Sequence, residues 1–216
     1  MSLCNFHLTG KKIIGAILNY KAGFAQNATV PKQPIVFLKA SSSYITEGQC
    51  IELPPGSTAI HEEVELGVII GKKGKNISES QALEYVGGYC LALDMTDMKT
   101  INEAKSSGFP WTVGKCFDTS CPVSRLVSCK ELPDPGKANL WCRVNGELVQ
   151  NACTDDLLFS VPALISYLSS SMTLEPGDLI LTGCPPGSTA VSDGDIIQAG
   201  LGDILTMEFP VKCAAK

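Results

Sequence analysis

The sequence predicts a mostly β fold with short helices, built as a single domain overall. Short apolar runs rich in valine and isoleucine recur along the 216 residues, and glycine and proline separate them as turns separate strands. Segments with the composition of a helix are few and short. With 44% hydrophobic residues the chain can bury a substantial core, and no repeat, low-complexity tract or charged linker divides it.

Strands are expected where apolar runs are bracketed by turn residues. In "RVNGELV", Asn145-Gly146 joins two alternating segments and therefore indicates a hairpin. "EPGDLILTG" indicates a turn that leads into a buried strand. The expected strands cover residues 13–18, 35–39, 64–71, 88–94, 138–144, 147–150, 178–182 and 203–211.

Helices are expected where a capping residue precedes good helix formers. The expected helices cover residues 78–85, 97–108 and 154–171. Ser78 is a suitable N-cap for the first, and Gly108 ends the second. Thr154 starts the third with two acids in its first turn, and Pro162 should interrupt or bend it. Irregular stretches remain around 21–34, 105–118 and 184–190. Loops of this length in a compact domain are usually functional.

The composition excludes several classes of partner. The formal net charge is −5 and the lysines and arginines are scattered, so we expect no nucleic-acid partner. The apolar run near the N-terminus contains Gly15 and is too short for a signal peptide or a membrane span. We therefore expect no membrane association and an intracellular location, cytoplasmic or mitochondrial. Ten cysteines without a CxxC pair are expected to be reduced, mostly buried thiols.

The stretch "HEEVELGVIIGKK" places acidic residues directly before and inside a strand-like apolar run. Side chains two apart share one face of a strand, so Glu63 and Glu65 should point the same way. Two buried like charges require a positive partner, and a divalent cation would serve as one. Asp94 ends the next apolar run and could supply a third oxygen ligand to that cation. Three carboxylates suit Mg²⁺ or Mn²⁺ better than Zn²⁺. The alternative is that Glu63 and Glu65 form the solvated face of an edge strand and that Asp94 is a turn or N-cap residue.

Several motifs together resemble the fumarylacetoacetate hydrolase superfamily, in its small acylpyruvase and oxaloacetate decarboxylase branch. They are "HEEVELGVIIGK", "VGGYCLALDMT", "SSGFPWTVGKCFDTSCPV", "VNGELVQ", "TLEPGDLILTGCPPG" and "GDILTMEF". The resemblance implies a mixed β-sandwich roll, normally a homodimer, and a metal held by Glu63, Glu65 and Asp94. It also implies an N-terminal strand and lid-like segment over residues 1–33 and a catalytic domain over 34–216.

The same resemblance assigns further site residues. Lys115, in "WTVGKCFDT", matches the lysine that holds a substrate carboxylate or stabilises a developing enolate. Thr182, in "LTGCPPG", matches a threonine that contacts substrate, and Asn19 and Tyr20 match a pair in the lid. Without the resemblance, Lys115 would be interpreted as a surface lysine and Thr182 as an ordinary strand residue.

The chain also departs from the family pattern. Family hydrolases activate water with a histidine and a glutamate on the lid, where this chain has Gly23 and Gln26. An arginine and a glutamine are replaced by Met98 and Ile101, which should make the pocket less basic. Pro186 likewise stands where the family commonly has a lysine. Since neither Gly23 nor Gln26 accepts a proton at neutral pH, C–C bond hydrolysis is in doubt.

Three functions remain open at this point. The first is a metal-dependent decarboxylase or tautomerase acting on a small 2-oxo or β-dicarbonyl acid such as oxaloacetate. The second is an acylpyruvase hydrolase with another base, for which His61 is the local candidate. The third is a catalytically silent homodimer that binds a metabolite or a protein. We rank them in this order.

Overall fold

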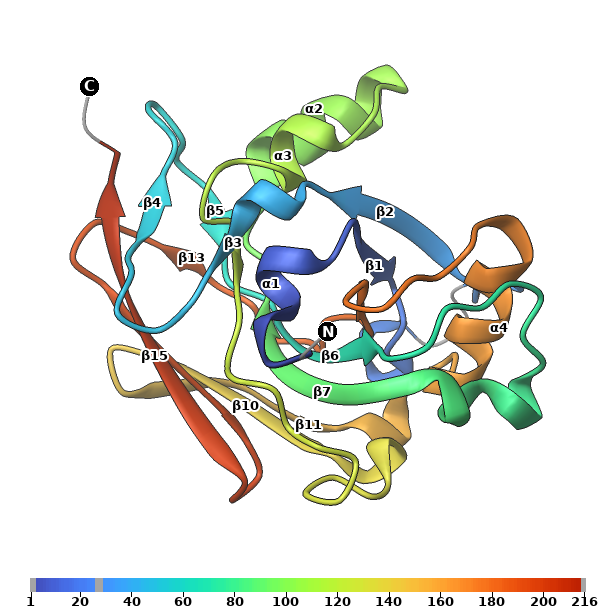
Figure 1. Cartoon of the computed structure of the whole chain (residues 1–216). Coiled ribbons are helices and arrows are strands. Elements are labelled where there is room, and N and C mark those ends of the chain that lie inside the picture. The colour runs from blue at the N-terminus through green and yellow to red at the C-terminus, as the bar shows by residue number, and fades with distance from the viewer. Residues whose placement is uncertain (1–2, 26–28, 215–216) are drawn as a thin grey trace.

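Two five-stranded sheets form the body of the protein in the computed structural model, which describes residues 3–25 and 29–214 (Figure 1). The first sheet has the order β2-β1-β12-β6-β7, with β1 parallel to β12 and every other pair antiparallel. Its strands are β1 (Ile13–Ile17), β2 (Ile35–Lys39), β6 (Val64–Ile70), β7 (Val86–Leu93) and β12 (Leu179–Leu181). Because β1 pairs with both β2 and β12, the N-terminal segment is part of the same body as the rest of the chain.

The second sheet has the order β11-β10-β14-β15-β4, and only β15 and β4 run parallel among these strands. Asn145 and Gly146, both at positive φ, form the expected hairpin between β10 and β11. The strands of the second sheet are β4 (Ile51–Leu53), β10 (Asn139–Val144), β11 (Glu147–Cys153), β14 (Ile196–Leu201) and β15 (Leu205–Cys213).

Shorter elements complete the fold. The small sheets pair β13 (Ala190–Val191), β5 (Ile60–His61) and β8 (Thr96–Asp97), and separately β3 (Tyr44–Ile45) with β9 (Cys121–Pro122). The α-helices are α1 (Phe6–Thr9), α2 (Met98–Ser107), α3 (Thr112–Lys115) and α4 (Val161–Ser171). The 3₁₀ helices are η1 (Leu3–Asn5), η2 (Lys21–Gly23), η3 (Ser41–Ser43), η4 (Glu79–Tyr85), η5 (Pro135–Lys137) and η6 (Thr154–Asp156).

The main core lies between the two large sheets, which confirms the predicted mixed β-sandwich. Alternate residues of β6, such as Leu66 and Val68, pack there against inward residues of the second sheet such as Leu140 and Phe209. The opposite face of the first sheet is also covered, because Ile69 packs in a second cluster with residues of α1 and β9. Every residue of β6 is therefore buried, and the strand's polar residue, Glu65, is buried with it.

Two expectations about the helices are wrong. Residues 154–171 do not form one helix, since α4 begins only at Val161. Ser160 caps α4 by accepting a hydrogen bond from the backbone N–H of Ala163, and Pro162 lies in the first turn, where a helix needs no N–H donor. The stretch 105–118 is also not wholly irregular, because it contains α3.

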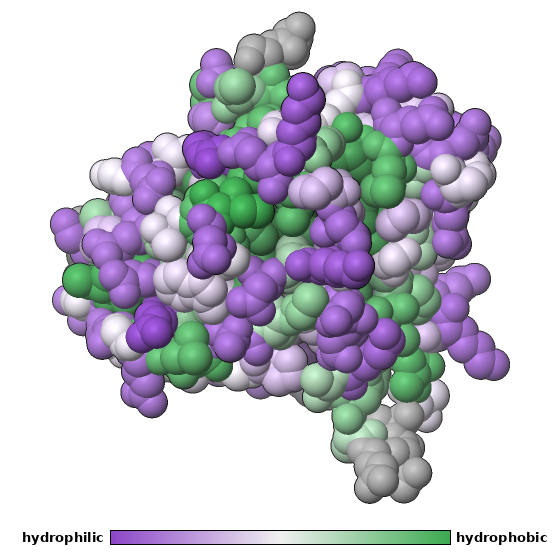
Figure 2. All heavy atoms as spheres, turned by 90° about the horizontal axis from the view of Figure 1, so that it is seen from below, coloured by the Kyte–Doolittle hydropathy of each residue, from purple (hydrophilic) through white to green (hydrophobic). Residues whose placement is uncertain are grey.

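The surface mixes polar and apolar residues. Figure 2 shows one face on which hydrophobic patches are interrupted by hydrophilic side chains. Among the described residues, no helix has both the length and the apolar character needed to cross a membrane. Of the ten cysteines, only Cys90, Cys121 and Cys142 are buried, so the expectation of mostly buried thiols is wrong.

Candidate metal centre and active site

Three carboxylates converge where β6 begins and its antiparallel partner β7 ends. One oxygen atom from each of Glu63, Glu65 and Asp94 lies within 4.8 Å of the others. Val64 pairs with Leu93 in the antiparallel ladder, and the Asp94 N–H donates to the Glu63 carbonyl at 2.8 Å. The pairing of the strand ends thus brings together residues about thirty positions apart in sequence. The structure places the three predicted ligands in one cluster.

Two buried lysines neutralise part of this cluster. The Lys115 ammonium lies 3.0 Å from Glu63 Oε2 and also contacts Asp94 and Thr96. The Lys39 ammonium lies 2.8 Å from the other oxygen of Asp94. Both lysines are buried, and Lys115 lies over the ring of Phe37 with its Nζ 4.5 Å from the centroid. Sequence reasoning found Lys115 through the family resemblance and missed Lys39 and Thr96.

The three carboxyl groups differ in their electrostatic surroundings. Burial would raise the pKa of Asp94, but Lys115 and Lys39 together hold it below its ordinary value. Burial raises the pKa of Glu63, and Lys115 offsets part of that rise. Burial and the neighbouring Asp94 and Glu63 raise the pKa of Glu65 well above its ordinary value. The pKa of Lys115 is raised because Asp94 and Glu63 outweigh the effect of its burial.

Glu65 gives the test of whether a metal ion fits. Its carboxylate accepts a hydrogen bond from the Gly183 N–H at 2.5 Å, and it makes no ion pair within residues 3–25 and 29–214. A buried carboxylate beside two others is unfavourable without a cation. Hard divalent cations take carboxylate oxygens as ligands. The donor set therefore fits a divalent metal ion held by Glu63, Glu65 and Asp94.

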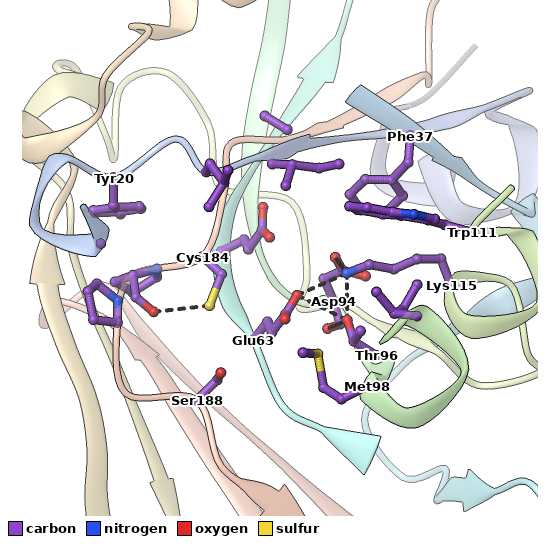
Figure 3. Close-up of a pocket in the computed structure, with 18 of the residues that line it drawn as sticks. Tyr20, Phe37, Glu63, Asp94, Thr96, Met98, Trp111, Lys115, Cys184 and Ser188 are labelled. Carbon is purple, nitrogen blue, oxygen red and sulfur yellow. Dashed lines mark hydrogen bonds and ion pairs between the residues drawn. The ribbon is translucent and has the colours of Figure 1, made fainter. Parts of the chain in front are cut away.

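The cluster lines a cavity of about 320 Å³. Figure 3 shows Lys115 reaching Glu63 and Asp94 beneath the rings of Phe37 and Trp111, with Tyr20 and Cys184 on the other side in this view. The remaining wall is mainly apolar and includes Met98, Ile101 and Pro186, at the three positions where the family pattern has polar residues. The cavity thus combines charged residues with apolar walls and is large enough for a small organic acid.

The other predicted site residues differ in whether they line the cavity. Tyr20 lines the cavity, and its buried hydroxyl has no hydrogen-bond partner among the described residues. Thr182 is buried at the end of β12 and does not line the cavity. His61 forms the end of β5, contacts the backbone of Ser188 and does not line the cavity either. Gly23 lines it without a side chain, and Gln26 lies outside the described residues.

The side chain of Asn19 links two backbone segments, at Phe159 and at Thr182, by hydrogen bonds. Its side-chain amide donates to the carbonyls of Phe159 at 2.9 Å and Thr182 at 2.8 Å, and its side-chain oxygen accepts from the Phe159 N–H at 2.8 Å. Asn19 is 1% exposed and does not line the cavity. Its polar atoms are thus used within the protein, which gives it a positioning role.

Asn19→Ala is therefore expected to lower the free energy of unfolding by about 2 to 3 kcal/mol, because it leaves buried backbone groups without partners. Urea unfolding of the wild type, Asn19→Ala and the exposed control Asn151→Ala measures this loss. A variant of unchanged stability with a raised KM would instead assign Asn19 to direct substrate contact.

Comparisons with known proteins agree with this geometry. A family described as fumarylacetoacetate (FAA) hydrolase C-terminal matches residues 12–212. The chain is 44% identical over 211 residues to mouse (Mus musculus) oxaloacetate tautomerase FAHD1, mitochondrial, covering 97% of this chain and 96% of the relative. It is 45% identical over 213 residues to an oxaloacetate decarboxylase, mitochondrial, of Dictyostelium discoideum, covering 95% and 96%.

Solved structures show the same architecture. Fumarylpyruvate hydrolase from Pseudomonas aeruginosa, in complex with Mn²⁺ and pyruvate, superposes with a TM-score of 0.87 at 31% identity. The match covers 95% of this chain and 91% of the hydrolase. The yeast fumarylacetoacetate hydrolase family protein ynq8 superposes with a TM-score of 0.88 at 29% identity, over 99% and 97% of the two chains.

Proposed function

Because the chain belongs to the fumarylacetoacetate hydrolase family, we propose that it is a divalent-metal-dependent enzyme that tautomerises or decarboxylates oxaloacetate or a similar small 2-oxo acid. The observation that carries the proposal is the cluster of Glu63, Glu65 and Asp94 beside Lys115 in the cavity lining. Relatives that are named as enzymes do not favour the catalytically silent alternative.

We propose Mg²⁺ or Mn²⁺ as the ion, with Glu63, Glu65 and Asp94 as its ligands. Carboxylate oxygens suit both ions, and a similar hydrolase is described with Mn²⁺ and pyruvate. When bound, the ion would polarise the 2-oxo group and favour electron flow toward its oxygen.

The chain's own residues would then stabilise the charge that develops on the substrate. Lys115 has a raised pKa, so it stays protonated at neutral pH and acts as a fixed cation rather than a base. In decarboxylation the C–C bond to the departing carboxylate breaks and its electron pair moves toward the 2-oxo group. In tautomerisation a proton leaves C3 and the oxygen gains one. Both reactions need a held carboxylate and a cationic neighbour for the oxygen, and Lys115 would be that neighbour.

C–C bond hydrolysis is less well supported. It requires a base that activates water, and no histidine lies among the described residues that line the cavity. Gly23 lines the cavity at the position of the family's histidine and has no side chain to accept a proton.

Tyr20 and Thr182 were both expected to contact the substrate. Tyr20 is better placed for this contact than Thr182, because Tyr20 lines the cavity.

Two further expectations stay predictions. The relatives' names place them in mitochondria, and we propose this compartment for the chain. A homodimer without nucleic-acid or membrane partners remains the expected state.

Purified protein with Mn²⁺ is expected to consume the enol of oxaloacetate, and excess chelator should abolish this activity. The test follows enol absorbance and pyruvate release in parallel. Pyruvate from oxaloacetate reports decarboxylation, and enol loss without pyruvate reports tautomerisation.

Acetylpyruvate should be hydrolysed at least about 100-fold more slowly than by a family hydrolase that has the lid histidine and glutamate, because that base is missing here. Turnover that persists unchanged in chelator would contradict the proposal.

A further inference from the structure

Helix α2 presents one cation to the cavity beyond the apolar residues already described. Met98, Ile101 and Lys105 all line the cavity, and their spacing of three and four residues places them on one helix face. The first two are the apolar replacements of the family's polar pair. Lys105, one turn later, restores a positive charge on the same face.

The ammonium of Lys105, an exposed residue, contacts an aromatic ring of the cavity wall. The Lys105 Nζ lies 4.8 Å from the centroid of the Trp111 ring, and Trp111 also lines the cavity. A cation over an indole face is held without being neutralised. Within residues 3–25 and 29–214, Lys105 makes no ion pair with a carboxylate. Its charge therefore remains available to a ligand.

The other cations near the cavity are already engaged. Of the described residues that line it, Lys105 and Lys115 carry a positive charge, and Lys115 contacts Glu63 and Asp94. Lys39 pairs with Asp94 and does not line the cavity. A second carboxylate on a substrate that is anchored at the carboxylate cluster can therefore pair with Lys105.

We propose that Lys105 binds the distal carboxylate of a dicarboxylic acid and makes the site prefer dianionic over monoanionic acids. The inference rests on the proposed function, because it takes the 2-oxo acid to be anchored at the carboxylate cluster. Met98, Ile101 and Trp111 then contact the carbon chain between the two charged ends. The preferred substrate is a short 2-oxo dicarboxylic acid, and an acylpyruvate with one carboxylate is the weaker ligand.

Malate and lactate test the inference without catalysis, because they share a 2-hydroxy acid group and differ by one carboxylate. Calorimetric titration in Mg²⁺ should show that the wild type binds malate more tightly than lactate. Lys105→Met is expected to reduce this preference about fivefold, as for an ion pair near solvent, and Lys105→Arg should retain most of it. Higher salt should weaken the preference of the wild type.

Lys99→Met is the matched control, since Lys99 is an exposed lysine of the same helix that does not line the cavity. An equal malate preference in Lys105→Met and Lys99→Met would overturn the inference. Turnover of oxaloacetate is measured on the same samples. If oxaloacetate is not turned over, the proposed function fails, while the comparison of malate with lactate still decides the role of Lys105.

Discussion

Glu65→Gln is expected to abolish tight binding of a divalent metal and, at the same time, to make the metal-free protein more resistant to unfolding. Glu65 is buried beside Glu63 and Asp94, and the Gly183 N–H is its hydrogen-bond donor. Glutamine keeps an oxygen acceptor for Gly183 but removes the charge. The affinity for Mn²⁺ should fall at least about 100-fold, because removing even an outer-shell partner of a metal ligand costs about 10-fold to 100-fold.

The gain in stability follows from the same burial. Removing a buried carboxylate that lacks a cation should raise the free energy of unfolding of the metal-free protein by about 1 to 3 kcal/mol. Titration calorimetry with Mn²⁺ and urea unfolding in chelator measure the two effects separately. Glu52→Gln is the control, because Glu52 is an exposed glutamate in β4. Unchanged Mn²⁺ binding in Glu65→Gln would remove the metal assignment.

Lys115→Met is expected to lower kcat about 100-fold to 1,000-fold, because it removes the cation that faces the reacting oxygen. The substitution leaves Glu63, Glu65 and Asp94 in place, so metal binding should persist. In chelator the variant should unfold more easily than the wild type, since Glu63 loses its ammonium partner. Added Mn²⁺ should restore part of that stability, because the ion would supply positive charge to the same carboxylates.

Lys39→Met separates catalysis from stability. Lys39 touches the same carboxylate, Asp94, but does not line the cavity. Its loss should reduce stability while kcat for the folded fraction falls far less than in Lys115→Met. Steady-state rates, normalised to folded protein by near-ultraviolet circular dichroism, make the comparison. Equal losses of kcat in the two variants would contradict a direct role for Lys115.

Most of the strands could be predicted because apolar residues and turn residues alternate clearly. The strands of the small sheets were missed, and so were β4 and β14 of the large second sheet. Gly200 shows why β14 was missed. Glycine inside a strand usually indicates a turn or a close approach, and here a β-carbon at Gly200 would lie 2.1 Å from the ring of Trp141. Trp141 is its partner across the β10–β14 pair. The glycine makes room for a neighbour that is remote in sequence.

The carboxylate cluster was predictable for a local reason and its surroundings were not. The period of two along a strand is enough to place Glu63 and Glu65 together. Lys39 could not be found, because its partner Asp94 follows a different strand, β7, and nothing near Lys39 in the sequence marks it as buried. Lys105 left a usable signal, since its spacing from Met98 and Ile101 places all three on one face of a predicted helix.

Gly23 bears on how this active site could change. A β-carbon built at Gly23 would meet no atom of residues 3–25 and 29–214 within 4 Å beyond its own chain neighbours, although the residue lines the cavity. The position can therefore accept a β-carbon without displacing these neighbours, and the stability cost of acquiring a side chain there is expected to be small. A library of variants at this single position would sample new proton-transfer groups on an otherwise intact scaffold. The loss of the family's histidine is in this sense sterically reversible, and the fold retains the capacity to evolve a second chemistry.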